Sequence, residues 1–154
     1  MGTVNSITIH EYGKENSKII VMFHPLGVWY DIFEYVIPIL EKEYHLIIPA
    51  IPGLDPDKPN SEFSSIEDIE SKITNWLLYN NYTHVTCFYG CSMGGSLVIR
   101  MIANNNIETD FAVIDAGITP YQFPKFLTYF VGVRDWCMTH LFSKVFWCIL
   151  NLMI

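Results

Sequence analysis

The sequence of 154 residues predicts an α/β domain built on a doubly wound, mainly parallel sheet. Short apolar runs alternate with segments whose apolar residues recur at helical spacing, which is the pattern of consecutive strand–helix–strand units. Hydrophobic residues make up 51% of the chain and no internal repeat is present, so we expect one buried core. We place this core in residues 1–118 and a separate aromatic-rich helical segment in residues 119–154.

Four apolar runs predict the strands of the sheet. They lie at residues 18–23, 45–50, 85–89 and 111–114. Continuous apolar character is typical of parallel strands that helices cover on both faces, so we expect all four strands to be buried. Residues 3–9 alternate polar and apolar side chains instead, which predicts an edge strand with one solvated face.

Three segments between these runs have helical spacing. Residues 30–42 form the first, although Pro38 inside it is expected to kink or shorten the helix. The second begins with the sequence SSIE at residues 64–67, a capping box in which Glu67 reaches back to the helix start, and it continues to about residue 80. The third predicted helix occupies residues 97–103.

Residues 90–94 read Gly-Cys-Ser-Met-Gly and match the G-x-S-x-G nucleophile elbow. A strand is predicted before this motif and a helix after it, which is the context that the motif requires. The backbone is strained at such a turn, and side chains at Gly90 and Gly94 would collide with the neighbouring strand or helix. Ser92 is therefore the predicted catalytic nucleophile, with its hydroxyl lifted out of the sheet. The other interpretation is a tight strand-to-helix turn without chemistry.

Attack by Ser92 on a carbonyl group creates an oxyanion that needs hydrogen-bond donors. The backbone amide of Met93 is the first candidate, because it opens the following helix, where amides are unpaired and the helix dipole favours negative charge. A second donor is expected from the loop after residues 18–23. Pro25 has no amide hydrogen, so Leu26 is the better candidate there, and His24 is expected to organise this loop.

These residues resemble the α/β-hydrolase superfamily, in particular its serine esterase, lipase and peptidase members with a helical cap. The resemblance extends over roughly residues 7–150. It depends on the apolar strand leading into His24, the Ile-Pro-Gly loop of residues 51–53, the elbow around Ser92 and the aromatic segment after Asp115. It implies a sheet of the α/β-hydrolase type in which residues 119–154 begin a helical cap or lid. Members of this superfamily continue well beyond such a segment, so the resemblance implies a truncated fold that holds only the N-terminal half.

A serine nucleophile needs a base, usually a histidine oriented by a carboxylate, and in this superfamily the chain order is serine, acid, histidine. His140 is the only histidine after Ser92, and in the presumed cap we expect it to have a structural role. Asp115 is a candidate acid ahead of Asp135, because ligands of open α/β sheets bind at the carboxyl ends of strands. The alternative role of Asp115 is to cap the turn beneath the lid.

The predicted function is hydrolysis of a carboxylic ester, or of a thioester or amide, through an acyl-Ser92 intermediate. An aromatic lid would favour small-molecule esters with apolar acyl groups. Without the catalytic histidine we expect little activity from this chain alone. The alternative is a non-catalytic, hydrolase-like module that binds partners or self-associates through an exposed sheet edge or its tail.

Charge and cysteine spacing exclude other classes of function. The net charge of −7 argues against nucleic-acid binding. The four cysteines lack C-x-x-C and zinc-ligand spacing, so we expect reduced thiols, no metal and no cofactor. Residues 1–12 lack the regions of a signal peptide, which predicts a cytoplasmic protein. In the tail, the uninterrupted apolar stretch is only residues 145–154, too short to span a membrane, and we do not expect membrane contact.

Overall fold

The computed structural model describes residues 7–117 and nine helical residues further along the chain, namely Phe126, Tyr129, Phe130, Val133, Arg134, Trp136, Cys137, Met138 and His140. The chain divides into two compact units, Met1–Thr119 and Pro120–Ile154. All the strands described below belong to the first unit. The cap assigned to residues 119–154 stays a prediction.

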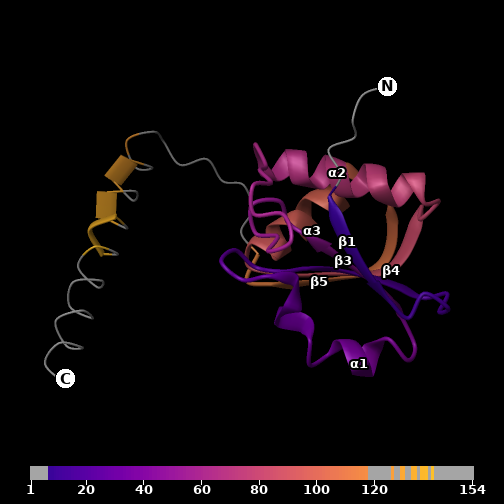
Figure 1. The fold of residues 1–154 in the computed structure, drawn as a ribbon. Helices are drawn as coiled ribbons and strands as arrows, with labels where there is room; N and C mark the ends of the chain where they lie inside the picture. The colour runs from indigo at the N-terminus through magenta and orange to yellow at the C-terminus, as the bar shows by residue number, and fades with distance from the viewer. Residues whose placement is uncertain are drawn as a thin grey trace, which may run out of the picture. The chain divides into compact units, whose positions relative to one another are not determined.

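The first unit is a five-stranded sheet with helices on both faces (Figure 1). Its elements follow one another as β1 (Thr8–Tyr12), β2 (Ile19–Phe23), the 3-10 helix η1 (Tyr30–Phe33), α1 (Ile37–Leu40), β3 (His45–Ala50), α2 (Ile66–Tyr79), β4 (His84–Cys91), α3 (Met93–Asn104) and β5 (Glu108–Asp115). The strands are arranged β1-β3-β2-β4-β5. Only β1 runs antiparallel to its neighbour, so the predicted mainly parallel, doubly wound sheet is confirmed.

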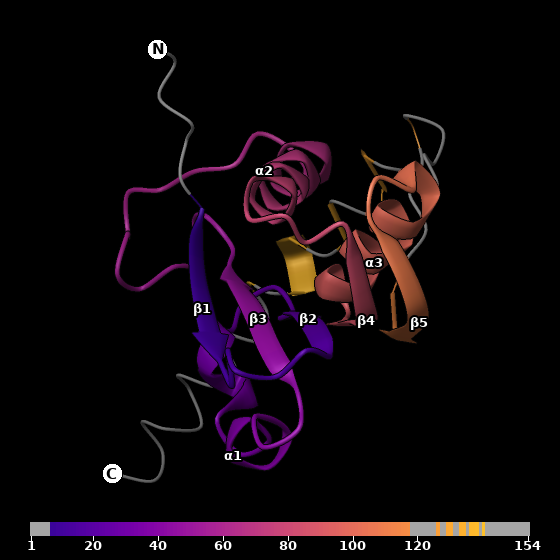
Figure 2. The ribbon, with the colours of Figure 1, turned by 90° about the vertical axis from the view of Figure 1, so that its right-hand side faces the viewer.

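Two hydrophobic clusters hold the helices to the sheet. On one face, α2 and α3 bury residues such as Ile73 and Leu97 completely against β2, β3 and β4. On the other face, η1 and α1 pack Phe33 and Ile37 against β2 and β3. In Figure 2, α1 lies next to the half of the sheet formed by β1, β3 and β2, away from β5. Burying one such side chain contributes roughly 1.5–3 kcal/mol, so each face is held mainly by apolar packing.

Strand β3 lies where the sequence predicts it, and all six of its residues are buried. Pro49 fits into it because of how the strand is paired. Parallel pairing with β2 ends at Ile47, and Pro49 lies opposite Ile9 of the edge strand β1. A proline cannot donate to a sheet ladder, and beyond Ile47 no pairing with β2 remains that would require its amide hydrogen. The edge strand itself was expected at residues 3–9 and lies at Thr8–Tyr12; residues 1–6 lie outside the described part of the chain.

Strand β5 corrects the expectation that all four apolar runs are buried. It is the last strand of the sheet, and most of its residues are exposed, among them Phe111 at 67% and Val113 at 48%. An apolar sequence predicts that a strand prefers burial, but burial also requires other segments of the chain to cover the strand and pair with it. Within the described residues, β4 is the only strand that pairs with β5.

The predicted helix at residues 30–42 is broken into η1 and the four-residue α1. Pro38 lies in the first turn of α1, the one place in a helix where its missing amide costs nothing. The capping box of α2 is displaced by one residue from the prediction. Ser65 is the N-cap and accepts a hydrogen bond from the Asp68 amide, while the Asp68 carboxylate accepts one from the Ser64 amide.

No helix in the described part of the chain is long and apolar enough to cross a membrane. The apolar stretch at residues 145–154 lies outside the described residues.

Candidate active site

Ser92 lies between the end of β4 and the start of α3, and it is exposed. Its backbone has φ 53° and ψ −115°. Asn105 also has a positive φ, but its ψ of 33° is in the left-handed region that asparagine tolerates. The backbone conformation of Ser92 lies outside that region. Such a conformation costs on the order of 1–3 kcal/mol, so the surrounding structure must enforce it.

Two close approaches explain the glycines of the motif. A Cβ atom on Gly94 would lie 2.7 Å from the carbonyl carbon of Phe23, the last residue of β2. A Cβ atom on Gly90 would lie 2.7 Å from the Gly95 amide nitrogen on the first turn of α3. Real Cβ atoms do not approach backbone atoms this closely, so only glycine lets β2, β4 and α3 meet at this turn.

The start of α3 provides amides next to Ser92. The first hydrogen bond of the helix ladder runs from the Ser96 amide to the Ser92 carbonyl oxygen at 3.1 Å. The amides of Met93, Gly94 and Gly95 therefore precede the ladder and point toward the helix N-terminus, where the dipole is positive. Met93, the predicted oxyanion donor, is the first residue of α3.

Asp115 meets Ser92 through the main chain. Its carbonyl oxygen accepts a hydrogen bond from the Ser92 amide at 2.7 Å, because β5 pairs with β4 up to Cys91. The Asp115 side chain interacts with the Cys91 thiol. Burial, and then the hydrogen bond to the Asp115 carboxylate, raise the pKa of Cys91. The candidate acid is therefore beside the nucleophile, with its carboxylate already engaged by the preceding residue.

The loop after β2 is organised by His24, which is completely buried. The Ile51 amide donates a hydrogen bond to His24 Nε2 at 3.2 Å, so Nδ1 carries the proton and donates to the Pro25 carbonyl oxygen at 3.1 Å. This arrangement joins the loops after β2 and β3, as expected from the sequence. Leu26, the second predicted oxyanion donor, follows in the same loop and is 62% exposed.

Burial lowers the pKa of His24 below its usual value of 6.5, so the folded state holds this imidazole neutral. Below about pH 6.5 the His24 imidazole binds a proton more readily in the unfolded chain than in the folded protein. The contribution of His24 to the free energy of unfolding is therefore fully present above that pH and declines as the pH falls. We expect urea unfolding to show a lower free energy of unfolding at about pH 5.5 than at about pH 7.5. The loss should be smaller in His24→Leu, since His10, whose pKa burial also lowers, remains in both proteins. Equal losses would contradict this assignment.

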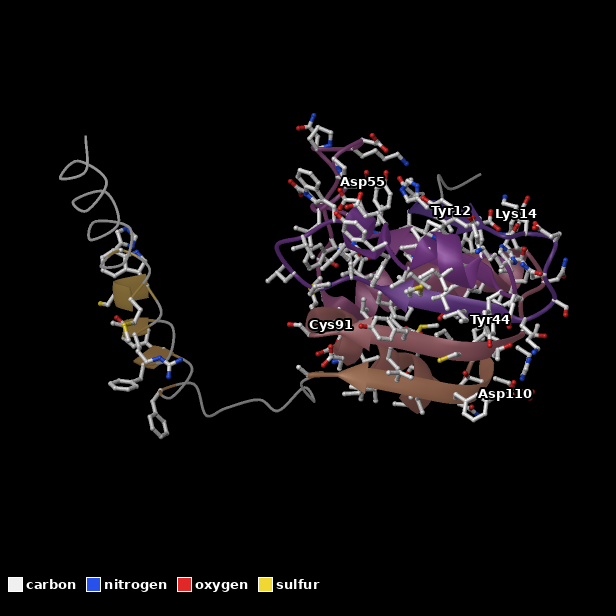
Figure 3. All side chains as sticks on the ribbon, turned by 90° about the horizontal axis from the view of Figure 1, so that it is seen from below. Tyr12, Lys14, Tyr44, Asp55, Cys91 and Asp110 are labelled. Atoms are coloured by element: carbon white, nitrogen blue, oxygen red, sulfur yellow. The ribbon has the colours of Figure 1, made fainter. Side chains whose placement is uncertain are left out.

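The described histidines do not supply a base to Ser92. His45 contacts Glu11 at 2.9 Å at the start of β3, and His84 contacts Asp110 at 2.9 Å at the start of β4. Figure 3 shows Asp110 at the end of the sheet opposite to Cys91. His10 lies on β1, three strands from β4, which is about 14 Å away at ordinary strand spacing. Added to the loop role of His24, these positions leave no histidine to act as the base for Ser92 among residues 7–117.

His140 belongs to the second unit. Its Nδ1 donates to the Trp136 carbonyl oxygen at 3.1 Å, and its ring lies 4.4 Å from that of Trp136. Both contacts are with a residue four positions earlier in the chain, and the structural role expected for His140 stays a prediction. Asp135, the other acid considered, lies outside the described residues.

A pocket of about 500 Å³ lies on the η1 and α1 side of the sheet. Its walls come from η1, α1, β2, β4 and β5, and Pro25 and Cys91 form its end nearest to the elbow. The sequence offered no signal for this pocket, because its walls come from segments far apart in the chain.

No protein-family model matches the chain, and no curated protein matches it either. Solved structures do match. An alpha/beta hydrolase family protein from Desulfitobacterium hafniense is 24% identical with a TM-score of 0.68, over 72% of this chain and 44% of that one. A carboxylesterase structure from the ammonia-oxidizing thaumarchaeon Nitrososphaera gargenis is 20% identical with a TM-score of 0.67, over 90% and 52%. A serine hydrolase from Cycloclasticus zankles is 19% identical with a TM-score of 0.66, over 80% and 46%.

The TM-scores show a shared fold, and this chain spans about half the length of each matched structure. The chain therefore has the α/β-hydrolase fold and contains its N-terminal half, as the sequence resemblance implied.

Proposed function

We propose that this N-terminal half of an α/β-hydrolase fold carries the nucleophile of a serine hydrolase, Ser92, which acts on a carboxylic ester or a related thioester or amide. The observation that carries the proposal is the strained, exposed Ser92 at the N-terminus of α3. A strain of this kind persists only where the surrounding structure enforces it, and it is concentrated at functional sites. The matched hydrolases and carboxylesterase support the same class of reaction.

In the proposed reaction, the Ser92 oxygen attacks the carbonyl carbon and a base accepts the hydroxyl proton. The Met93 amide, with Leu26 as the proposed second donor, would stabilise the resulting oxyanion. Collapse of this intermediate expels the alcohol and leaves acyl-Ser92, which water then hydrolyses. Asp115 is the proposed acid, and the bond between its carboxylate and Cys91 would have to yield for it to orient a histidine.

Turnover by this chain alone is expected to be low, because no described histidine is placed to accept the Ser92 proton. We expect hydrolysis of a chromogenic short-chain ester by the wild type to be no more than about twofold faster than by Ser92→Ala, since a serine without a base is a weak nucleophile. Robust turnover that depends on Ser92 would contradict the low activity and would show that a base is present.

A test of the elbow itself must not depend on the missing base. Ser92→Cys is suitable, because a helix N-terminus lowers the pKa of a thiol and thereby increases its reactivity at neutral pH. We expect alkylation by iodoacetamide at position 92 to be at least about tenfold faster than at the exposed loop position of a Ser17→Cys control. Position 92 shares a tryptic peptide with Cys87 and Cys91, so fragmentation of that peptide in the mass spectrometer is used to locate the label. Equal rates at positions 92 and 17 would refute the proposed nucleophile site.

A further inference from the structure

The described residues of the second unit share an exposed apolar face. All nine are helical, and Figure 1 draws part of this unit as helix. Six of them follow the i, i+3, i+4, i+7 spacing that places side chains on one face of a helix. We call these six the aromatic stripe: Phe126, Tyr129, Phe130, Val133, Trp136 and Cys137. All six are exposed, and the exposed fractions of the four aromatic residues range from 61% to 76%.

The aromatic stripe repeats every seven residues. Its members form three pairs at this spacing, namely Phe126 and Val133, Tyr129 and Trp136, and Phe130 and Cys137. A seven-residue apolar repeat lets two helices pack along a common seam, with the side chains of one helix fitting between those of the other. None of the six residues is an acid or a base with a formal charge, so two copies of the stripe can meet without like-charge repulsion. Spacing and charge therefore both fit a second helix with the same stripe.

The area of the stripe is large enough for a specific dimer. Aromatic side chains bury roughly 150–250 Å² each when they are fully covered, so the exposed parts of the stripe offer on the order of 500–600 Å² per chain. Two copies would then bury on the order of 1,000–1,200 Å², which reaches the roughly 1,000 Å² that a specific interface needs. Exposed apolar patches on monomeric proteins rarely exceed a few hundred Å². An interface at the small end of the range is typical of weak association.

The outer edge of β5, the other surface considered for self-association, is less suited to it. If two complete β5 strands paired antiparallel, Glu108 of one copy would lie opposite Asp115 of the other at both ends of the pair. Like charges that lie directly opposite each other destabilise strand pairing. The acidic ends of β5 thus favour the aromatic stripe as the contact surface.

We propose that two copies of this chain form a homodimer in which the aromatic stripes of their second units pack against each other. The two faces are identical, so the contact closes as a two-fold dimer and does not extend into a filament. The stripe is in the second unit and Ser92 is in the first, so dimerisation and the proposed reaction are tested separately.

Sedimentation velocity of the full-length chain measures the association. We expect a single chain at about 1 µM and mainly a dimer at about 100 µM, for a dissociation constant on the order of 10 µM. Over the same range, alkylation of Cys137 by N-ethylmaleimide should slow about fourfold, because the dimer covers the stripe. Cys87 and Cys91 of the first unit share one tryptic peptide, and the alkylation of this peptide is the internal control that should not change.

Three substitutions locate the contact surface. Val133→Glu places a charge in the middle of the stripe and should give a single chain at both concentrations, with equal alkylation of Cys137 at each. Met138→Glu is the matched control, because Met138 is also exposed but lies about 100° further round the helix than Cys137. This variant should dimerise as the wild type does. Phe111→Lys places a charge on the exposed strand β5 and should also leave the dimer unchanged.

Four results would overturn the proposal. The first is a single wild-type chain at about 100 µM, and the second is loss of the dimer in Met138→Glu or Phe111→Lys as well as in Val133→Glu. The third is alkylation of Cys137 that is equally slow at both concentrations, which would mean that the stripe is covered within one chain. The fourth is a monomer that co-sediments with phosphatidylcholine vesicles and loses this binding in Val133→Glu, which would make a lipid surface the occupant instead.

Discussion

Gly94→Ala is expected to lower the free energy of unfolding by about 3 kcal/mol, at the upper end of the cost of overpacking. The added methyl group would lie 2.7 Å from the Phe23 carbonyl carbon. The atoms it meets belong to the backbone of β2, which is held between β3 and β4 and cannot move aside as a flexible side chain would. Urea unfolding followed by circular dichroism measures the change.

The same substitution should also remove the reactivity of the elbow. In a Ser92→Cys background, Gly94→Ala would displace the first turn of α3, and the fast alkylation at position 92 should fall to the rate of the Ser17→Cys control. Ile102→Ala is a matched control on the exposed side of α3 and should change stability by less than about 0.5 kcal/mol. Wild-type stability in Gly94→Ala would mean that β2 and α3 are not as close as described.

His24→Leu is expected to destabilise the protein by about 2 kcal/mol. The two side chains are similar in size, so the main cost is the buried Ile51 amide, which would lose the Nε2 atom that accepts its hydrogen bond. The loop that contains Leu26 would also lose its link to the loop after β3. Urea unfolding at neutral pH gives the change in stability.

His84→Leu is the comparison for this prediction. His84 also has a hydrogen-bond partner, Asp110, but both side chains are about half exposed and water can replace the contact. Removing it should cost less than about 1 kcal/mol. If the two leucine variants are equally stable, His24 does not organise the loops as proposed.

The sequence predicted most reliably the features that depend on neighbouring residues. The elbow was found because its close approach between Gly90 and the start of α3 involves residues five or fewer positions apart. Strand β3 was placed correctly because six buried residues in a row leave little choice of structure. The cap of α2 was displaced by one position because Ser64 and Ser65, followed by Glu67 and Asp68, satisfy the capping pattern in two registers.

What the sequence failed to predict depends on residues far apart in the chain. The run at residues 111–114 of β5 is as apolar as an interior strand, yet its exposure depends on whether other segments cover it and pair with it. The hydrogen bond between the Ile51 amide and His24 joins residues 27 positions apart, and the apolar pocket combines loop, helix and strand segments. From the sequence, the catalytic base could be described only as a histidine missing after Ser92 and the acid. Among residues 7–117 the structure does not place a histidine as a base for Ser92.

The hydrogen bond from the Ser92 amide to the Asp115 carbonyl oxygen ties the strained turn at Ser92 to the final residue of β5. A chain emerging from the ribosome would therefore already contain the whole motif while lacking the contact that restrains it. Since synthesis proceeds at about 5–20 residues per second, the serine would remain conformationally relaxed for at least a second or so until β5 had been made and had joined the sheet. The strained turn at Ser92 would then be completed late in folding, only after β5 has joined the sheet.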